Sequence, residues 1–281
     1  WSPSIWTGFN SIRFDEEMLR QAFYQNLQPD IFATQFNGNT RFDLLTALYA
    51  VWHRQPDLFE WPVDETGRVR FKLDLIAPLN GFAAHNAHDA LGDVEATIYI
   101  ARQIAQRAPA LWVELLANRD KVHVQARIEA FQPMALIERF GGGSPRATLG
   151  CFCGYSVSNP NQAAFFDLEA ADPADFLTAD DATLFAAVDA TPKVIRSLSV
   201  NKTPALLSLP KPTDLQLRRA EAIANAPEFR ARVAQALAAR FPEDPEAPTP
   251  LVEKQIFGGF YSHADKGLLA QFQRADWPQR Q

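Results

Sequence analysis

The chain has 281 residues, of which 47% are apolar and 21% charged, with a net charge of −6 and a pI near 5.4. This composition excludes disordered, collagen-like and coiled-coil proteins, and the length allows two ordinary domains or one large one. No run of about 18 apolar residues and no signal peptide is present, so we expect no membrane contact and a cytoplasmic location. The two cysteines, Cys151 and Cys153, are too few for a disulfide framework or a four-ligand zinc site.

Helical periodicity dominates the first half of the chain. A short strand is expected at residues 5–10, and apolar spacing predicts helices at 15–27, 42–52, 72–79 and 88–107. The last of these has the clearest pattern, with an apolar stripe formed by Leu91, Val94, Ile98, Ala101 and Ala105.

The second half is more mixed. Strands are expected at residues 122–128, 148–156, 163–168 and 194–200, and helices at 173–188 and 214–240. The three glycines at 141–143 predict a turn, and the proline-rich acidic segment 242–250 predicts a linker. The sequence therefore predicts an α/β chain with a helix-rich first half joined to a small mixed β unit.

Charge is unevenly distributed along this second half. Residues 165–190 contain seven acidic residues and no Lys or Arg, whereas residues 191–240 contain nine basic residues and three acidic ones. The acidic chain as a whole argues against a nucleic-acid partner, but a basic surface can coexist with it. The alternative is a solvated helical face.

Three residues could together perform hydrolysis. Asp15 stands where a predicted strand gives way to a helix, and His88 precedes Asp93 by five residues. Five residues turn a regular helix by about 500°, which would leave the two side chains about 140° apart. They converge better if His88 lies in the loop before the helix and Asp93 on the inward face of its first turns.

Such a set suits hydrolysis of a phosphodiester with divalent metal ions. Carboxylates are good Mg²⁺ ligands, two ions can stabilise the attacking and leaving oxygens, and a histidine can accept the proton of the attacking water. Each residue also has a simpler explanation. Asp15 and Asp93 can be ordinary acids in the first turn of a helix, and His88 can be structural.

Several segments, in one order, are similar to the bacterial exodeoxyribonuclease I family. Residues 7–17 closely resemble its second exonuclease motif, and residues 86–97 resemble its third motif, of the HxxxxD kind. Further similar segments are residues 41–45, 71–73, 200–204 (Asn-Lys-x-Pro) and 257–265. The ordered set is far more specific than HxxxxD alone.

The resemblance implies a DEDDh-type 3′-to-5′ exonuclease, a hydrolase that releases mononucleotides from single-stranded DNA with Mg²⁺ and acts in DNA repair. Asp15 and Asp93 would be metal ligands and His88 the general base. The implied fold is part of an RNase H-like exonuclease domain (1–122), an SH3-like DNA-binding domain (123–248) and the start of a helical domain (249–281). The basic residues after 190 would then belong to the DNA-facing domain.

The resemblance also suggests residues that contact the DNA strand. By position these are Arg20, Lys72, Asn161, Arg196 and Asn201, and Lys202 is added from its charge and proximity. For each of the six, an ordinary surface role stays open. Trp6, Phe9 and Phe14 could stack on bases, but we expect them to pack in the core.

The chain departs from the family at both ends. The family's first motif, an Asp-x-Glu on the first strand, should lie upstream of Asp15 but is absent, as is the later part of the helical domain. We therefore expect a fragment that is poorly active or inactive by itself. The resemblance also implies a monomer that binds single-strand-binding protein. The alternatives are a related exonuclease acting on RNA ends, or a non-catalytic module that binds single strands or docks a partner.

Overall fold

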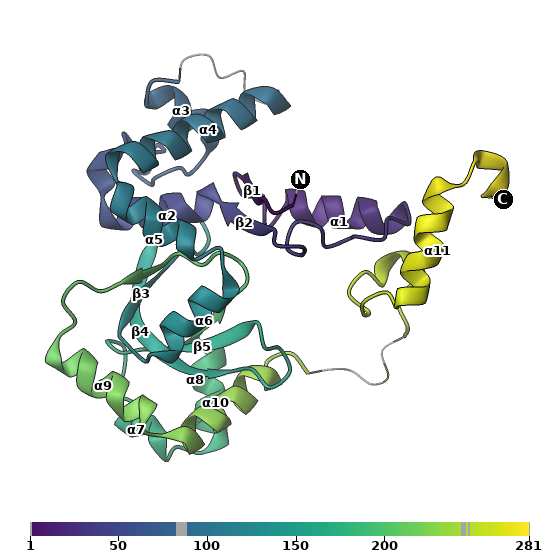
Figure 1. The fold of residues 1–281 in the computed structure, drawn as a ribbon. Coiled ribbons are helices and arrows are strands. Elements are labelled where there is room, and N and C mark those ends of the chain that lie inside the picture. The colour runs from purple at the N-terminus through teal and green to yellow at the C-terminus, as the bar shows by residue number, and fades with distance from the viewer. Residues whose placement is uncertain (1, 83–88, 243–245, 247, 281) are drawn as a thin grey trace. The chain divides into compact units, whose positions relative to one another are not determined.

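The computed structural model describes residues 2–82, 89–242, 246 and 248–280 and divides the chain into two compact units (Figure 1). Unit 1 consists of residues 1–41 together with 243–281, and unit 2 consists of residues 42–242. Helices and strands occur together in the chain, which confirms the α/β class expected from the sequence. The expected domain limits after residues 122 and 248 stay predictions.

Unit 1 joins the beginning of the chain to its end. Strand β1 (Ile5–Gly8) is followed by helix α1 (Asp15–Gln25) and then by strand β2 (Thr40–Asp43), which pairs with β1. The C-terminal part contains the 3-10 turn η2 (Val252–Lys254), helix α11 (His263–Arg274) and the 3-10 turn η3 (Trp277–Gln279).

Hydrogen bonds and aromatic contacts hold the two segments of unit 1 together. Gln21 Nε2 donates to the carbonyl of Glu253 at 2.7 Å, and Tyr24 Oη donates to that of Val252 at 2.7 Å. The ring of Phe32 lies 5.8 Å from that of Phe260 and crosses it at 69°, the edge-to-face geometry that aromatic pairs favour.

Unit 2 begins with helices whose apolar sides face one another. They are α2 (Leu44–Arg54), the 3-10 turn η1 (Pro56–Leu58), α3 (Leu73–Leu79), α4 (Ala90–Arg107), α5 (Pro109–Ala117) and α6 (Lys121–Glu129). In α2, Leu44, Leu48 and Val51 follow the helical period and are buried. Ile76 of α3 and Ile100 of α4 are fully buried as well.

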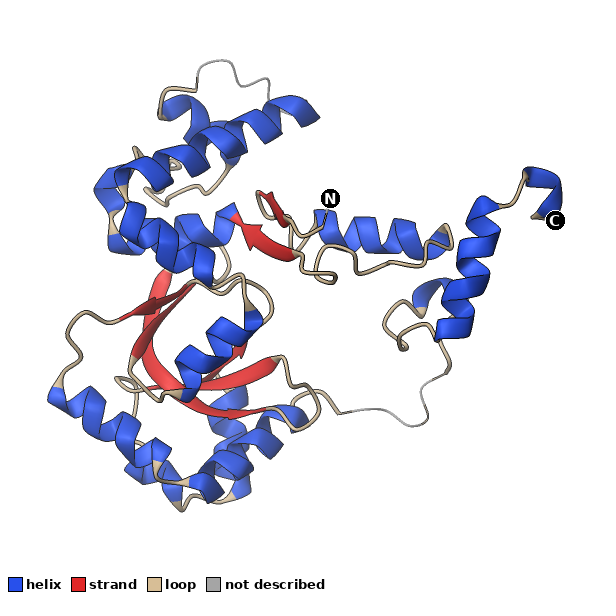
Figure 2. Cartoon of the chain, viewed as in Figure 1, coloured by secondary structure: helices blue, strands red, loops and turns tan. Residues whose placement is uncertain are grey.

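A five-stranded antiparallel sheet follows, in the order β6-β5-β4-β3-β7 (Figure 2). Its strands are β3 (Met134–Glu138), β4 (Arg146–Tyr155), β5 (Gln162–Asp167), β6 (Ile195–Ser199) and β7 (Leu206–Ser208). Four further helices complete the unit: α7 (Ala174–Leu177), α8 (Asp181–Asp189), α9 (Asp214–Ala224) and α10 (Pro227–Ala239).

Helices cover both faces of this sheet. Alternate residues of β5 point to opposite faces, so Phe165 joins a core with Ile128 of α6, whereas Phe166 joins a core with Phe229 of α10 and Leu184 of α8. The central strands are therefore rich in apolar residues, whereas the edge strand β6 also carries Arg196, Ser197 and Ser199.

Residues 122–128 are helical, so the strand expected there is wrong. They belong to α6, whose first turn is capped by Asp120, the carboxylate of which accepts a hydrogen bond from Val122 N at 2.8 Å. The sequence alternates apolar and polar residues, but only Val124 and Ile128, one helical turn apart, are fully buried, while Val122 is 71% exposed. Burial here follows the helical period, which the short alternation concealed.

The prediction that the apolar stripe of α4 faces the core is also wrong. Leu91, Val94 and Ile98 are exposed, and the buried side of the helix is formed by Gly92, Ala96, Thr97, Ile100 and Ile104. This side of α4 packs against α3 and α5. The sequence pattern did not reveal it because its first residues, Gly92 and Ala96, are small and only weakly apolar.

We expected three aromatic residues of unit 1 to pack in the core, but none of them is fully buried. Trp6 is 38% exposed and Phe14 is 63% exposed, while Phe9 is half-buried. Core packing is therefore wrong for Trp6 and Phe14. Strand β1 pairs only with the short strand β2, so no second layer covers these side chains.

The two thiols lie in the core of unit 2. Cys151 and Cys153 of β4 are both fully buried and unbridged, and burial raises the pKa of the Cys151 thiol to about 12. Within the described ranges, the helices are all too short or too polar to cross a lipid bilayer.

A bulge in β4 generates the first prediction. Cys153 is an extra residue between the pairs Phe152–Phe165 and Gly154–Ala164, and Gly154 has φ +145°. A Cβ atom there would lie 2.8 Å from the carbonyl oxygen of Arg230 in α10. We expect Gly154→Ala to lower the free energy of unfolding by about 2 kcal/mol, measured by urea denaturation.

The matched control for this change is Gly143→Ala. A Cβ atom at Gly143 would lie 3.5 Å from its nearest neighbour, and the backbone there needs no left-handed conformation. The control should change stability by less than about 0.5 kcal/mol. Equal effects of the two substitutions would show that the bulge is not the source of the loss.

Candidate functional site

Asp15 is the first residue of α1, and its side chain is exposed. Phe14, which precedes the helix, provides no side-chain cap, and the first turn is instead held by Glu16 N, which donates to the carbonyl of Ser11 at 2.9 Å. Successive helical residues are about 100° apart, so Asp15 faces outward while Glu16 faces inward. The outward carboxylate lies at the positive end of the helix dipole.

Glu16 is the centre of a buried ionic cluster. Its Oε2 atom accepts hydrogen bonds from Arg20 Nη2 at 2.6 Å, Arg41 Nη1 at 2.7 Å and Thr34 Oγ1 at 3.3 Å. The side chains of Glu16, Arg20 and Arg41 are each only 5–6% exposed. The cluster joins the first turns of α1 to β2 and to the loop between them, next to Asp15. Sequence reasoning missed it, although an acid followed four residues later by an arginine is a helical ion-pair signal.

Arg20 therefore has structural partners in unit 1. Besides Glu16, its guanidinium contacts Glu17 Oε1 at 2.9 Å and lies 5.6 Å above the ring of Phe32. Burial lowers the pKa of Arg20, and the neighbouring carboxylate of Glu16 opposes this effect. These contacts favour the structural alternative for Arg20 over a role in strand contact, which stays a prediction.

Asp93 lies in the first turn of α4 in unit 2. Asp89 caps this helix, with its carboxylate accepting from Gly92 N at 3.3 Å, and Thr97 Oγ1 donates to the carbonyl of Asp93 at 2.8 Å. The Asp93 side chain is exposed, so the expected inward position is wrong. The inward side of this turn is taken by Gly92 and Ala96, which are small enough for close helix packing.

The geometry of the predicted metal site is described only in part. His88 lies outside the described residues, and Asp15 and Asp93 belong to different units. The part of the chain that the structure describes holds no group of three or more His, Cys, Asp or Glu side chains that could bind a metal ion. By donor type, the two exposed carboxylates fit Mg²⁺, which prefers oxygen ligands.

Three of the predicted strand contacts come together at one end of the sheet. Strands β5 and β6 are antiparallel, so Asn161, just before β5, lies beside the residues that follow β6. The carbonyl of Asn161 accepts a hydrogen bond from Val200 N at 2.9 Å, and Asn201 and Lys202 follow directly. Lys202 is exposed, and Asn161 and Asn201 are half-buried.

Lys72 and Arg196 occupy other positions in unit 2. Lys72 is exposed at the beginning of α3. Arg196 lies on β6, an edge strand, with Nη1 3.9 Å from Glu138 Oε2 and its guanidinium carbon 5.3 Å from the centre of the Phe140 ring. Its Nε atom is buried and has no hydrogen-bond partner among the described residues.

Phe140 was not anticipated from the sequence. It is 58% exposed and begins the loop that contains Gly141, Gly142 and Gly143. Arg139 holds this loop by donating from Nε to the carbonyl of Gly143 at 2.8 Å. The available signal was an aromatic residue directly before a run of glycines, which have no side chains to cover it.

Part of the uneven charge along the chain is balanced within unit 2. Three arginines of the basic segment pair with acids of the acidic segment: Arg219 with Asp172 at 3.2 Å, Arg232 with Asp181 at 3.0 Å and Arg240 with Asp189 at 3.3 Å. Arg230 donates to backbone carbonyls of Ile223 and Ala224 at the end of α9. These four of the nine basic residues have partners within the unit, and the DNA-facing role of the basic segment stays a prediction.

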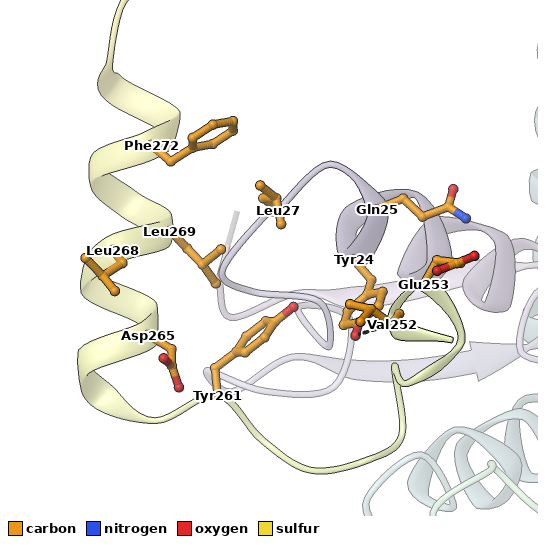
Figure 3. Close-up of a pocket in the computed structure, with 10 residues that line it drawn as sticks. All are labelled: Tyr24, Gln25, Leu27, Val252, Glu253, Tyr261, Asp265, Leu268, Leu269 and Phe272. Atoms are coloured by element: carbon orange, nitrogen blue, oxygen red, sulfur yellow. Dashed lines mark hydrogen bonds between the residues drawn. The ribbon is translucent and has the colours of Figure 1, made fainter. Parts of the chain in front are cut away.

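A separate cavity of about 860 Å³ lies in unit 1 between α1 and α11 (Figure 3). Its lining is mainly apolar and includes Leu27, Leu269 and Phe272. Tyr24 and Tyr261 stack at its base with ring centres 6.3 Å apart and planes 6° from parallel, and burial raises the pKa of Tyr261. None of the residues predicted from the sequence lines this cavity.

The buried cluster generates the second prediction. Arg41→Met keeps the bulk of the side chain but removes one of the two cations that bind Glu16. We expect a loss of about 3 kcal/mol in the free energy of unfolding, measured by urea denaturation, because a buried charge loses its partner.

The exposed Arg13, in the same unit, is the control. Arg13→Met should change the free energy of unfolding by less than about 0.5 kcal/mol. A loss for Arg41→Met no larger than for this control would mean that the cluster contributes nothing to stability.

Comparisons of sequence and of structure relate the chain to the same known proteins. No family model matches the chain. Exodeoxyribonuclease I of Escherichia coli is 29% identical over 281 residues, which cover 93% of this chain and 59% of that protein. The chain thus spans about three fifths of the length of this relative.

Solved structures agree with the sequence comparison. A crystal structure of Escherichia coli Exonuclease I in complex with a dA16 oligonucleotide superposes with a TM-score of 0.81 and 26% identity, covering 98% of this chain and 63% of that one. A crystal structure described as SSB/Exonuclease I in complex with an inhibitor superposes with a TM-score of 0.75 and 26% identity, covering 97% and 61%. In sequence and in fold, the chain is therefore related along nearly its whole length to bacterial exodeoxyribonuclease I.

Proposed function

We propose that this protein hydrolyses single-stranded DNA from its 3′ end, releases 5′-mononucleotides and acts in DNA repair and recombination. The observation that carries the proposal is the likeness to exodeoxyribonuclease I, which extends over 93% of the chain in sequence and 98% in structure. The two motifs that carry Asp15 and Asp93 each present an exposed carboxylate in the first turn of a helix, which supports the same function.

Asp15 and Asp93 would hold the metal of the reaction. Both are oxygen donors that suit Mg²⁺, and Mg²⁺, when bound, supplies positive charge that stabilises the attacking and leaving oxygens of phosphodiester hydrolysis. His88 would accept the proton of the attacking water, since an imidazole titrates near neutral pH. The Glu16 cluster would keep the first turn of α1 in place while Asp15 binds.

Binding of the DNA strand would involve the edge and turns of the sheet in unit 2. Asn161, Asn201 and Lys202 gather at one end of β5 and β6, and Arg196 lies on β6 itself. Lys72 would contribute a further cation from the beginning of α3. A monomeric, cytoplasmic protein that docks single-strand-binding protein is part of the same proposal, and the SSB/Exonuclease I structure supports the docking.

Substitution of Asp93 tests the reaction directly. In the protein expressed from its complete gene, Asp93→Ala should abolish shortening of a 5′-labelled single-stranded DNA, because a metal ligand is lost. Binding of the strand should change less than about threefold, since Asp93 would hold the metal and not the bases. The measurement is a time course of the oligonucleotide ladder with Mg²⁺, repeated with EDTA.

Glu95→Ala is the matched control, since Glu95 is an exposed acid on the same helix, two residues after Asp93, and takes no part in capping it. It should retain most of the activity. Cleavage near the wild-type rate by Asp93→Ala would remove Asp93 from the site. Binding without any cleavage by the wild-type protein would favour the non-catalytic strand-binding module, and preference for an RNA oligonucleotide would favour the exoribonuclease.

Substitution of Arg196 tests strand binding. Arg196→Ala should weaken binding and reduce the slope of log affinity against log salt concentration by about one unit, because one phosphate contact is lost. Fluorescence anisotropy with a labelled oligonucleotide at several salt concentrations measures both quantities.

Arg232→Ala is the control, because Arg232 pairs with Asp181 within the unit. It should leave the salt slope unchanged. If the slope is also unchanged for Arg196→Ala, Arg196 makes no phosphate contact and has an ordinary surface role.

A further inference from the structure

We propose that Phe140 is a stacking platform for a base of single-stranded DNA, an inference that rests on the strand-binding part of the proposed function. Phe140 is the second residue after β3, and 58% of its surface is exposed. A single exposed aromatic residue is common at protein surfaces, so the proposal depends on what surrounds the ring.

The loop keeps the ring uncovered. Gly143 N donates to the carbonyl of Phe140 at 3.3 Å, and Arg139 closes the same turn through the carbonyl of Gly143. Gly141 adopts φ +57°, a conformation that favours glycine. The three residues after Phe140 therefore form a defined turn without side chains that could cover its ring.

Arg196 adds a cation beside the ring. Its guanidinium carbon lies 5.3 Å from the ring centre, within the range of a cation–π contact. Its ion pair with Glu138 is loose, since Nη1 lies 3.9 Å from Oε2, longer than a hydrogen bond. The Nε atom is buried, so an anion would bind the terminal nitrogens of the guanidinium, whose side chain is 23% exposed.

This combination matches how proteins bind single strands. Bases stack on aromatic side chains while nearby cations bind the phosphates, and each stacked base contributes enough that its loss weakens binding about 5- to 150-fold. Arg196 projects from the same face of the sheet as Phe165, its partner on β5, and its side chain is 23% exposed beside the exposed ring, so a strand could reach both. The chemistry fits single-stranded nucleic acid better than a duplex, whose bases are already stacked.

The chain contains a matched control. Phe241 is 63% exposed and also has an arginine over its ring, Arg240 at 5.1 Å. Arg240, however, is bound to Asp189 at 3.3 Å and to Ser197 Oγ at 3.3 Å. The two phenylalanines share exposure and a cation–π contact, and they differ in how closely the arginine is paired, since Arg196 makes only the 3.9 Å ion pair with Glu138.

The test measures binding of a fluorescein-labelled oligothymidylate to the 281-residue chain by anisotropy, with EDTA present so that no cleavage occurs. Phe140→Leu removes the aromatic face but keeps apolar bulk, and we expect Kd to rise about tenfold. Phe140→Tyr, which keeps the face, and the control Phe241→Leu should each stay within about twofold of wild type. Circular dichroism should be unchanged in all three, since both rings are exposed.

Two further readouts separate stacking from a structural or electrostatic effect. The salt slope should be the same for Phe140→Leu and wild type, because no phosphate contact is lost. With an oligonucleotide of abasic sites, the difference between Phe140→Leu and wild type should disappear.

Binding by Phe140→Leu within twofold of wild type would overturn this inference and leave the proposed nuclease function standing. A loss that persists with abasic sites would also overturn it. Absence of binding by the wild-type chain would overturn both the inference and the strand-binding part of the proposed function, whereas the cleavage assay tests the catalytic part separately.

Discussion

The antiparallel sheet of unit 2 has a hydrophobic core on each face, and the positions of its candidate binding residues follow from this constraint. Alternate residues of β5 enter two different cores, one closed by α6 and the other by α8, α9 and α10. A ligand can therefore approach only the turns, the edges and the parts of a face that the helices leave exposed. Asn161, Asn201 and Lys202 lie at the turns at one end of β5 and β6, whereas Arg196 projects, 23% exposed, from the same face as Phe165 and lies beside Phe140.

Charge pairing within the unit adds a second restriction. The acidic and basic segments, separate in the sequence, are joined by ion pairs such as Arg219–Asp172 and Arg232–Asp181. Exposed pairs of this kind contribute little to stability, but each reduces the charge available to a polyanion. The acid that faces Arg196 lies beyond hydrogen-bond distance. Arg196 is therefore a better candidate for a phosphate contact than the arginines of the same segment that are closely paired.

The proposed catalytic carboxylates depend on different supports. Asp15 stands beside a buried cluster in which one carboxylate, Glu16, binds two arginines, whereas Asp93 stands on a helix capped by Asp89. In both cases the side chain is exposed in the first turn of a helix. The chain spans about three fifths of the length of its Escherichia coli relative, and the complete site stays a proposal.

The sequence alone determined the fold class, most helices and strands, and the ordered motifs around Asp15 and Asp93, because helical periodicity and local motif order are properties of neighbouring residues. It misassigned residues 122–128 and the buried side of α4, because a short alternation and a stripe of large apolar residues do not reveal which neighbours they meet. Only the tertiary structure decided that the charged segments pair, that Glu16 is buried between two arginines and that Phe140 lies beside Arg196. Apart from the pair Glu16–Arg20, which is one helical turn apart, those relations join residues between 25 and 56 positions apart, brought together by packing that no local pattern encodes.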